Sequence, residues 1–261
     1  MNGFYTDTLL HLLSNDLVRR DMRILVVCGG EHDKQALEHS GFRNVTISNL
    51  DARMNGKEFA PFTWSFQDAE KIAFRDNEFD FCIVHDGLHH CRSPHRALLE
   101  MYRVARCGLL VFEPRDSLVA RLGLLLNFSQ EYEVSGISWN EFTYGGVQNT
   151  EIPNHVYRWT EREVKKTISS FAPWGRHEYL FFYRLRVPWM RLRALRNKLW
   201  LTAAYAALPF LRLFTWIFPK QCNNFAFAVF KPAVPQNLHP WIEHRDGEFR
   251  INRPWLQKRY R

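Results

Sequence analysis

The sequence predicts one α/β domain built on a doubly wound, mostly parallel sheet. Short, continuous apolar runs recur along residues 24–112, which is typical of strands buried on both faces. Segments with apolar residues at helical spacing alternate with these runs, and this order favours parallel neighbours joined by right-handed crossovers. With 261 residues, the chain is long enough to bury one sizeable core.

Residues 1–114 are expected to hold four strands and three helices. Leucines at helical spacing predict a helix over 6–20, and a second helix is expected over 33–40. Ser93 and Pro94 are typical of an N-cap and a first helical position, so a third helix begins there and ends before Gly108. The apolar runs predict strands at 24–27, 44–50, 79–84 and 109–112.

The pattern is less regular beyond residue 114. Helices are expected over 118–125 and from the capping box at Thr160 and Glu163 to Phe171. Two more strands are expected at 177–187 and 224–231. A single domain over 1–261 follows, with its core at about 20–114 and 160–232, insertions at 129–158 and 188–220, and a tail at 233–261.

Charge is unevenly distributed along the chain. Residues 184–261 contain 15 Lys and Arg against 3 Asp and Glu, whereas residues 1–183 contain 20 against 24. Such a basic segment binds an anionic partner (a membrane surface, a phosphorylated substrate or nucleic acid) or is a solvated face without one. Nucleic acid is not expected as a partner, because no nucleic-acid-binding motif accompanies the charge.

The five cysteines predict reduced thiols in a cytoplasmic protein. Their number is odd, their spacing is uneven, and several lie in apolar runs, which argues against a disulfide framework. No secretory signal is expected, since residues 1–13 lack a basic start and an uninterrupted apolar core.

The stretch 68–114 carries the most specific motif. It begins with the letters DAE at 68–70, passes through an apolar strand to LHH at 88–90, and continues through a helix to a second strand ending at Glu113. This order resembles the class I S-adenosylmethionine-dependent methyltransferases, in their small-molecule, type 11-like branch. The resemblance implies a Rossmann-like methyltransferase sheet whose last strand is antiparallel, with a helical insertion before that strand. It also implies an enzyme with S-adenosylmethionine as cofactor.

The resemblance places the first cofactor-binding residues in the loop after the first strand. Cys28, Gly29 and Gly30 stand where the family has its glycine-rich loop, although only the central glycine pair is kept. Val26 stands at the family's acidic position and His32 at its last glycine. Glycines there allow the backbone to approach a ligand closely.

Two further segments complete the implied cofactor site. Asn49 stands where the family has an acid that binds the ribose, and Asp51, two residues later, is the alternative. Asp68 stands where family members bind the adenine amino group, with Ala69 and Glu70 beside it. An Asn/Asp turn after a strand without any ligand is the other interpretation of 49–51.

Candidate catalytic residues follow two predicted strands: His85, Asp86, His89 and Glu113. Methyl transfer requires alignment and exclusion of water, and sometimes a base, for which a histidine is suited near neutral pH. No metal site is expected. Adjacent residues such as His89 and His90 do not converge easily on one ion, and the spacing fits no zinc motif.

The acceptor is expected to be a polar small molecule or a lipid-linked glycan. The methyl group is expected to be transferred to an oxygen atom of this acceptor. The insertion 129–158 mixes aromatic rings with amides, as sugar-binding surfaces do and as ordinary packed lids also do; its members are Tyr132, Trp139, Asn140, Tyr144, Asn149, Asn154, His155 and Tyr157. N- or C-methylation of a metabolite is the nearest alternative. A non-catalytic cofactor-binding scaffold, suggested by the degenerate glycine loop, is the more distant one.

Residues 199–218 form a long apolar run, yet a membrane-spanning helix is not expected. The strands predicted on either side would be neighbours in one sheet, and Pro209 would interrupt a straight helix. A helical hairpin in contact with an anionic membrane surface is predicted, and a homodimer interface or a buried lid is the alternative. The basic and aromatic residues that suggest an interfacial anchor are Arg191, Arg193, Arg196, Lys198, Trp189, Trp200 and Trp216.

Overall fold

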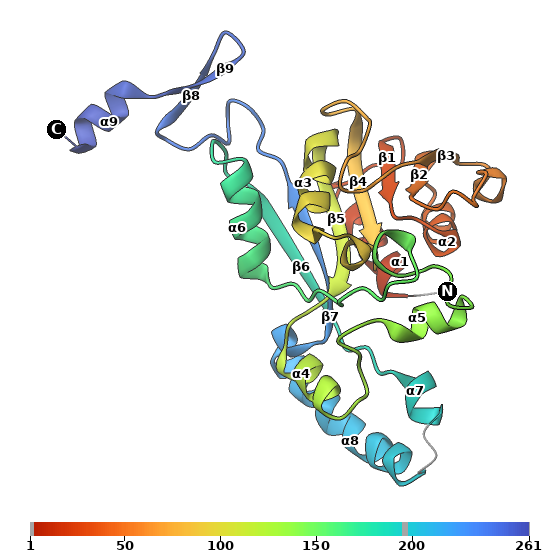
Figure 1. The fold of residues 1–261 in the computed structure, drawn as a ribbon. Coiled ribbons are helices and arrows are strands. Elements are labelled where there is room, and N and C mark those ends of the chain that lie inside the picture. Colours follow the sequence, from red (N-terminus) through yellow and green to blue (C-terminus); the bar gives the residue numbers. More distant parts are fainter. Residues whose placement is uncertain (1–2, 195–197, 261) are drawn as a thin grey trace.

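A seven-stranded sheet forms the centre of the molecule (Figure 1). The computed structural model describes residues 3–194 and 198–260. Strand order in the sheet is β3-β2-β1-β4-β5-β7-β6, and β7 is antiparallel to both of its neighbours. The predicted doubly wound sheet with an antiparallel last strand is therefore confirmed. In chain order the strands are β1 (Arg23–Val27), β2 (Asn44–Asn49), β3 (Thr63–Phe66), β4 (Phe79–His85), β5 (Ala105–Pro114), β6 (Glu178–Arg184) and β7 (Asn224–Phe230).

Helices cover both faces of the sheet. One face packs against α1 and α2, and the other packs against α3 and α6. Alternate residues of each strand face opposite helix layers. In β1, Ile24 and Val26 pack on the side of α1 and α2, and Leu25 and Val27 pack on the side of α3 and α6. The main helices are α1 (Phe4–Ser14), α2 (Glu31–His39), α3 (Pro94–Val104), α4 (Leu118–Leu125), α5 (Val134–Trp139), α6 (Glu161–Phe171), α7 (Trp189–Ala194), α8 (Lys198–Ile217) and α9 (Arg253–Tyr260).

Two helix starts agree with the predicted caps. Ser93 Oγ accepts a hydrogen bond from Arg96 N, and Thr160 Oγ1 accepts one from Glu163 N, both at 3.3 Å. The helix expected over 6–20 is shorter, because α1 ends at Ser14 and Asp16 takes a positive φ of 54°. The chain then folds back under α1, and Val18 is buried there.

Several elements were not predicted, among them the tail helix α9. The strand β3 is short, lies at the sheet edge and has no buried residue, so it lacks an apolar run. The helix α5 lies within the insertion expected to be irregular. In the tail, β8 (Ile242–Arg245) and β9 (Glu248–Ile251) form a separate hairpin. Asp246 and Gly247, both with positive φ, make its turn, and this dipeptide is a hairpin signal in the sequence.

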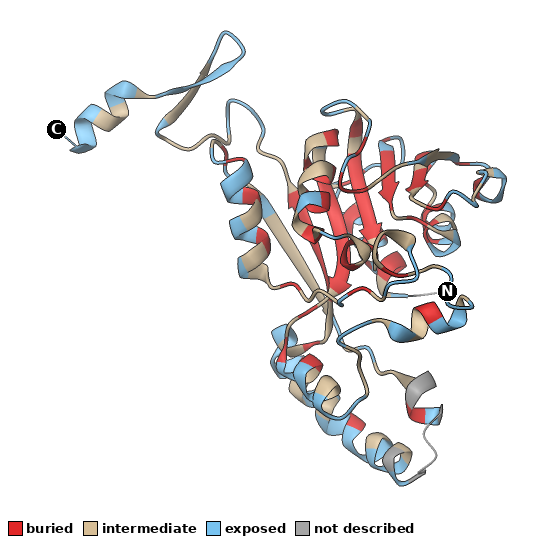
Figure 2. Ribbon diagram, in the orientation of Figure 1, coloured by how far each residue is buried: buried red, intermediate tan, exposed pale blue. Residues whose placement is uncertain are grey.

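The region 188–220 forms two helices, α7 and α8, that contact one another, as a helical hairpin predicts. Together with α4 they extend from the end of the sheet at which β5 ends and β7 begins (Figure 1). Their surfaces are far more exposed than the strands (Figure 2). Arg196 lies outside the described residues, as do the side chains of Arg191, Lys198 and Trp200. No helix within the described residues is long and apolar enough to cross a membrane.

Candidate functional site

The carboxyl ends of β1, β2 and β4 meet at one edge of the sheet, because these strands are parallel neighbours. In doubly wound folds, ligands bind outside this edge. The predicted cofactor residues of the first two loops and the predicted catalytic residues after β4 therefore lie at the same end of the molecule.

The loop after β1 is shaped by close packing. Cys28 has a positive φ of 54°, and a Cβ on Gly29 would lie 2.7 Å from Val26 Cγ1 and 2.8 Å from Ile47 Cγ2. Gly29 is thus required by the packing of the sheet itself. Gly30 differs, because a Cβ there would meet nothing within 4 Å. The open backbone at Gly30 is suited to a ligand that approaches the loop.

Asn49 and Asp51 have different roles at the end of β2. Asn49 Nδ2 donates to the carbonyl oxygen of Gly29 at 2.8 Å, so this amide ties the first two loops together. Asp51 is buried and forms an ion pair with Arg53, and hydrogen bonds from that guanidinium lower the pKa of the carboxyl below its ordinary value. Asp51, two residues beyond the position at which the resemblance implies a ribose-binding acid, is thus a charged acceptor.

The DAE segment follows β3. Asp68 is half-buried, Ala69 is buried, and Asp68 Oδ1 accepts from the backbone N–H of Glu70 at 2.9 Å. The Glu70 carboxylate accepts hydrogen bonds from Ser93 N at 2.8 Å and Arg92 N at 3.1 Å. It therefore supports the start of α3, and Asp68 remains the member of this segment with a carboxylate near the surface.

Part of the insertion lies across these loops. Gln148 Nε2 donates to Glu70 Oε2 at 3.2 Å, and Asn149 contacts the Asp51 carboxylate. The Arg53 guanidinium stacks on the Tyr144 ring, with its carbon 3.0 Å from the ring centre. The sequence predicts that this insertion binds the acceptor, and in the structure its residues 144–149 contact the loops that follow β2 and β3.

A cavity of about 640 Å³ opens beside the end of β4. The predicted catalytic residues His85 and Asp86 line it. The remaining lining comes from the start of α1, one face of α2 and the ends of β6 and β7: Gly3, Phe4, Tyr5, Thr6, His32, Gln35, Ala36, Glu38, His39, Arg184, Leu185, Arg186 and Asn224. The cavity is large enough for a small molecule.

His85 is held in place by stacking. Its ring is parallel to that of Tyr5, with the centres 4.8 Å apart, and burial lowers the pKa of His85 below its ordinary value. The imidazole is therefore neutral at pH 7, which is the form that accepts a proton. Its neighbour Asp86 has a positive φ of 50° and an Oδ2 atom 3.2 Å from Arg186 Nη1.

The residues around this cavity carry polar atoms without partners. Asp86 Oδ1 and Asn224 Oδ1 are buried and have no hydrogen bond within the part of the chain that the structure describes. Buried polar groups are otherwise almost always satisfied. A polar ligand or ordered water in the cavity would supply such partners.

His89 and Glu113 form a separate, deeper pair. His89 Nδ1 lies 2.6 Å from Glu113 Oε2, and both side chains are buried. Burial alone would lower the pKa of His89, but the Glu113 carboxylate raises it well above its ordinary value. The structure places this pair away from the cavity lining, so the four predicted catalytic residues divide into two groups.

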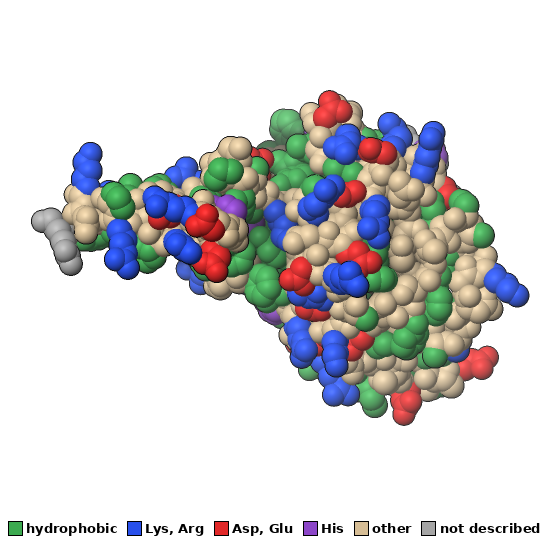
Figure 3. All heavy atoms as spheres, turned by 90° about the horizontal axis from the view of Figure 1, so that it is seen from above, with side chains coloured by type: hydrophobic (Ala, Val, Ile, Leu, Met, Phe, Trp, Pro, Cys, Tyr) green, Lys and Arg blue, Asp and Glu red, His purple; other side chains and the backbone are tan. Residues whose placement is uncertain are grey.

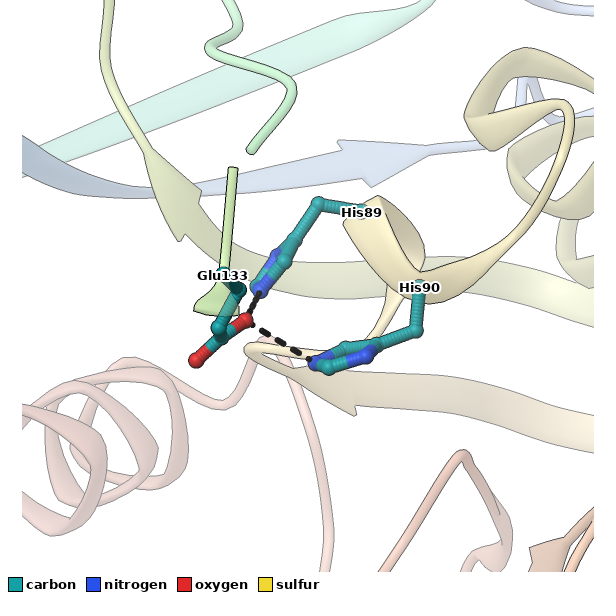
Figure 4. A group of neighbouring side chains, drawn as sticks. All are labelled: His89, His90 and Glu133. Carbon is teal, nitrogen blue, oxygen red and sulfur yellow. Dashed lines mark ion pairs between the residues drawn. The ribbon is translucent and has the colours of Figure 1, made fainter. Parts of the chain in front are cut away.

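Several residues of this region were not predicted from the sequence. Tyr5 lies on a helix whose spacing indicated only core packing, and Arg53 belongs to no motif. Glu133 contacts both His89 and His90 from the insertion, at 3.5 Å each (Figure 4). Their positions depend on contacts between distant segments, for which the local sequence carries no signal.

Part of the chain is similar to known methyltransferases. Residues 25–112 match the family described as "Methyltransferase domain". The chain is 32% identical over 117 residues to the ubiquinone/menaquinone biosynthesis C-methyltransferase UbiE of Ruegeria sp.; this match covers 38% of the chain and 47% of that protein. The chain thus spans about half the length of the curated relatives that it matches.

Solved structures share the fold across most of the chain. The YcgJ protein of Bacillus subtilis is 13% identical, with 87% of this chain and 99% of that chain covered and a TM-score of 0.50. The cyclase SpnF is 15% identical, with 87% and 80% covered and the same TM-score. The resemblance found at 68–114 is confirmed over residues 25–112, which match the methyltransferase domain family. Because one fold neighbour is named as a cyclase, the fold alone does not determine the reaction.

Proposed function

We propose that the protein transfers a methyl group from S-adenosylmethionine to a small molecule bound in the cavity beside β4. The observation that carries this proposal is the methyltransferase domain at 25–112, whose strand β4 ends in the cavity. His32 and Ala36 of α2 line the same cavity, so it adjoins the loop at Gly30. Donor and acceptor would therefore meet at one edge of the sheet.

The residues at this edge fit the cofactor. Gly30 offers open backbone, Asp51 offers a charged acceptor for ribose hydroxyls, and Asp68 offers a carboxylate for the adenine amino group. When bound, the cofactor supplies a methyl group on a positively charged sulfur. Displacement by the acceptor forms one bond to carbon and breaks the carbon–sulfur bond, so the protein contributes mainly alignment and exclusion of water.

His85 is proposed as the residue that receives the acceptor's proton. It lines the cavity, its ring is fixed against Tyr5, and its neutral form is available at pH 7. The nearby Asp86 would stabilise the imidazolium that forms. His89 and Glu113, which do not line the cavity, are not assigned this role.

The acceptor is proposed to be a polar small molecule or a glycan that is methylated on oxygen. The polar side chains of the cavity lining and the unpartnered atoms beside it support a polar acceptor. C-methylation is the alternative, favoured by the name of the relative UbiE. Most of the cavity lining lies outside residues 25–112, in α1 and at the ends of β6 and β7.

Calorimetry and product analysis test the proposal. Titration with S-adenosylmethionine and with its demethylated product should show one site, and incubation with cell extract should give methylated products detectable by mass spectrometry. The mass and fragmentation of the product distinguish oxygen, nitrogen and carbon acceptors. Lack of binding by either compound at millimolar concentration would contradict the proposal, and binding without turnover would indicate a cofactor-binding scaffold.

We also propose that α4 and α8 contact an anionic membrane surface. Phe210, Leu213 and Trp216 of α8 are exposed, as are Leu118, Leu122 and Leu125 of α4. Large exposed apolar patches mark interaction sites. Arg212 and Lys220 are exposed beside them, and basic residues next to an apolar face are typical of an interfacial helix. A homodimer interface is the alternative.

A further inference from the structure

Two histidines and one glutamate converge between the insertion and the loop after β4. His89 and His90 belong to the short 3₁₀ helix Leu88–His90, and Glu133 precedes α5. Figure 4 shows both imidazole rings directed at one oxygen of the Glu133 carboxylate. Its Oε2 atom lies 3.5 Å from Nε2 of His89 and 3.5 Å from Nε2 of His90.

These separations are those of ligands on one metal ion. One ligand atom from each of the three residues lies within 4.8 Å of the other two. Two ligands bound at ~2.0–2.1 Å to a tetrahedral ion lie about 3.4 Å apart, close to the spacing seen here. Two imidazoles and a carboxylate are the donor set of several catalytic zinc sites, which keep a fourth position open.

Neighbouring residues hold the three side chains of the cluster in the way that metal ligands are usually held. A metal-binding histidine usually donates its second ring N–H to a carboxylate, which fixes its tautomer. His89 does this with the buried Glu113, whose Oε2 lies 2.6 Å from Nδ1. The His90 ring contacts the backbone of Gly146, and Asn154 Nδ2 lies 3.5 Å from Glu133 Oε2. All three ligands are therefore held by further partners.

We propose that His89, His90 and Glu133 bind one divalent transition-metal ion, for which Zn²⁺ is the best-fitting candidate. Such an ion would join the start of α5 to the loop after β4. It would therefore hold residues 133–149 against the loops that follow β2 and β3. With three protein ligands, the ion would keep a position open for water or for an oxygen of a ligand.

The sequence argued against a metal because adjacent residues such as His89 and His90 do not converge easily on one ion and the spacing fits no zinc motif, and Glu133 lies 43 residues beyond His90. The structure removes that objection, since the 3₁₀ helix directs both rings to the same carboxylate. An ion-pair network without metal is the competing explanation, in which a protonated His89 bridges Glu113 and Glu133. The experiment must separate these two.

Metal titration of untagged, chelator-treated protein tests the inference. Zn²⁺ should bind with one equivalent per chain in calorimetry, and Co²⁺ should give visible absorption of a four- or five-coordinate site without a thiolate charge-transfer band. His90→Ala and Glu133→Gln should each weaken Zn²⁺ binding by more than ~100-fold, since a direct ligand matters more than an outer partner, whose loss costs about 10–100-fold. His155→Ala, an exposed histidine of the same insertion, is the matched control and should bind normally.

A stability measurement guards against misfolded variants. Zn²⁺ should raise the melting temperature of the unaltered protein and of His155→Ala, but not that of Glu133→Gln, because only ions bound to the folded state stabilise it. Absence of Zn²⁺ binding at micromolar protein, or binding and stabilisation unchanged in both ligand variants, would overturn the inference. A thiolate band with Co²⁺ would also overturn it, by assigning the ion to the cysteines. These readouts do not depend on methyl transfer.

Discussion

His85 and His89 are four residues apart in the sequence but lie in different surroundings. His85 lines the cavity beside Asp86, whereas His89 is buried against Glu113. The turn between them contains Gly87, where a Cβ would lie 2.6 Å from Cys28 Cβ. The loops after β1 and β4 therefore approach each other closely at Gly87.

Replacing His85 by Ala should lower the turnover number by more than ~10-fold, the lower end of what a positioned base contributes. Binding of S-adenosylmethionine should change little, because no predicted cofactor residue contacts the ring. Steady-state kinetics and calorimetry measure the two effects. His155→Ala should retain the original turnover. Full activity in a folded His85→Ala protein would mean that alignment alone suffices for the reaction.

Asp33 makes folding stability depend on pH. This carboxyl is buried in α2 beside Tyr5, and burial raises its pKa from an ordinary 3.8 to about 7. A raised folded-state pKa means that its contribution to stability is fully present below pH ~4 and is lost as the pH rises through ~7. Between pH 5 and 8, unfolding should become easier by roughly 2–3 kcal/mol because of this one group.

The variant Asp33→Asn isolates that effect. It keeps an oxygen for the hydrogen bond that Gly30 N donates at 2.9 Å, but it cannot ionise. Urea unfolding at pH 5 and pH 8 should therefore show a smaller loss of stability in the variant than in the original protein. The contributions of the other titrating groups are the same in both proteins and cancel in this comparison. Equal losses in the two proteins would show that Asp33 titrates normally.

At the scale of elements, the insertion contacts the predicted cofactor-binding loops. Tyr144 stacks under Arg53, Asn149 contacts Asp51, and Gln148 bonds to Glu70. A cofactor whose ribose binds Asp51 must displace the contact from Asn149. Residues 144–149 are therefore expected to open before the cofactor enters.

Tyr144→Ala should accelerate binding of S-adenosylmethionine, because it removes the ring that anchors Arg53. Stopped-flow measurement of the association rate should show an increase of about twofold to fivefold, corresponding to the ~0.5–1 kcal/mol of an exposed cation–π contact. Tyr132→Ala, an exposed tyrosine elsewhere in the insertion, should leave the rate unchanged. A slower rate in Tyr144→Ala would indicate that the segment forms part of the binding surface.

The whole molecule is asymmetric in charge and in apolar surface. The tail ending in α9 extends away from the sheet and carries several Lys and Arg side chains, with some acidic ones between them (Figure 3). The exposed apolar residues of α4 and α8 lie at another end of the molecule, beside the carboxyl edge of the sheet (Figures 1 and 2). A membrane bound there would lie close to the cavity.

Co-sedimentation with anionic vesicles tests that surface. The protein should bind at low salt and partly dissociate at high salt, because each basic residue near the surface contributes about 1 kcal/mol. The double variant Phe210→Ser and Trp216→Ser should weaken binding by at least ~10-fold, since each buried aromatic side chain contributes about 1.5–3 kcal/mol. Trp139→Ser, an exposed tryptophan of α5, is the control. Protein that stays in solution and migrates as a dimer would favour a subunit interface.

The local sequence alone determined most of the sheet. Strands β1, β4 and β7 are buried on both faces, which demands continuous apolar runs, and such runs are visible without a structure. The caps at Ser93 and Thr160 are equally local, because a cap and its partner lie three residues apart. The short edge strand β3 escaped prediction because an edge strand needs no such run.

Tertiary structure decided how distant segments combine into sites. The cavity joins α1 to the ends of β4, β6 and β7, and Glu133 reaches His89 and His90 from the insertion. Periodicity records whether a side chain is buried, but not which distant side chain it meets. That choice depends on the packing of whole elements, whose contacts are long-range and leave no fixed spacing in the sequence.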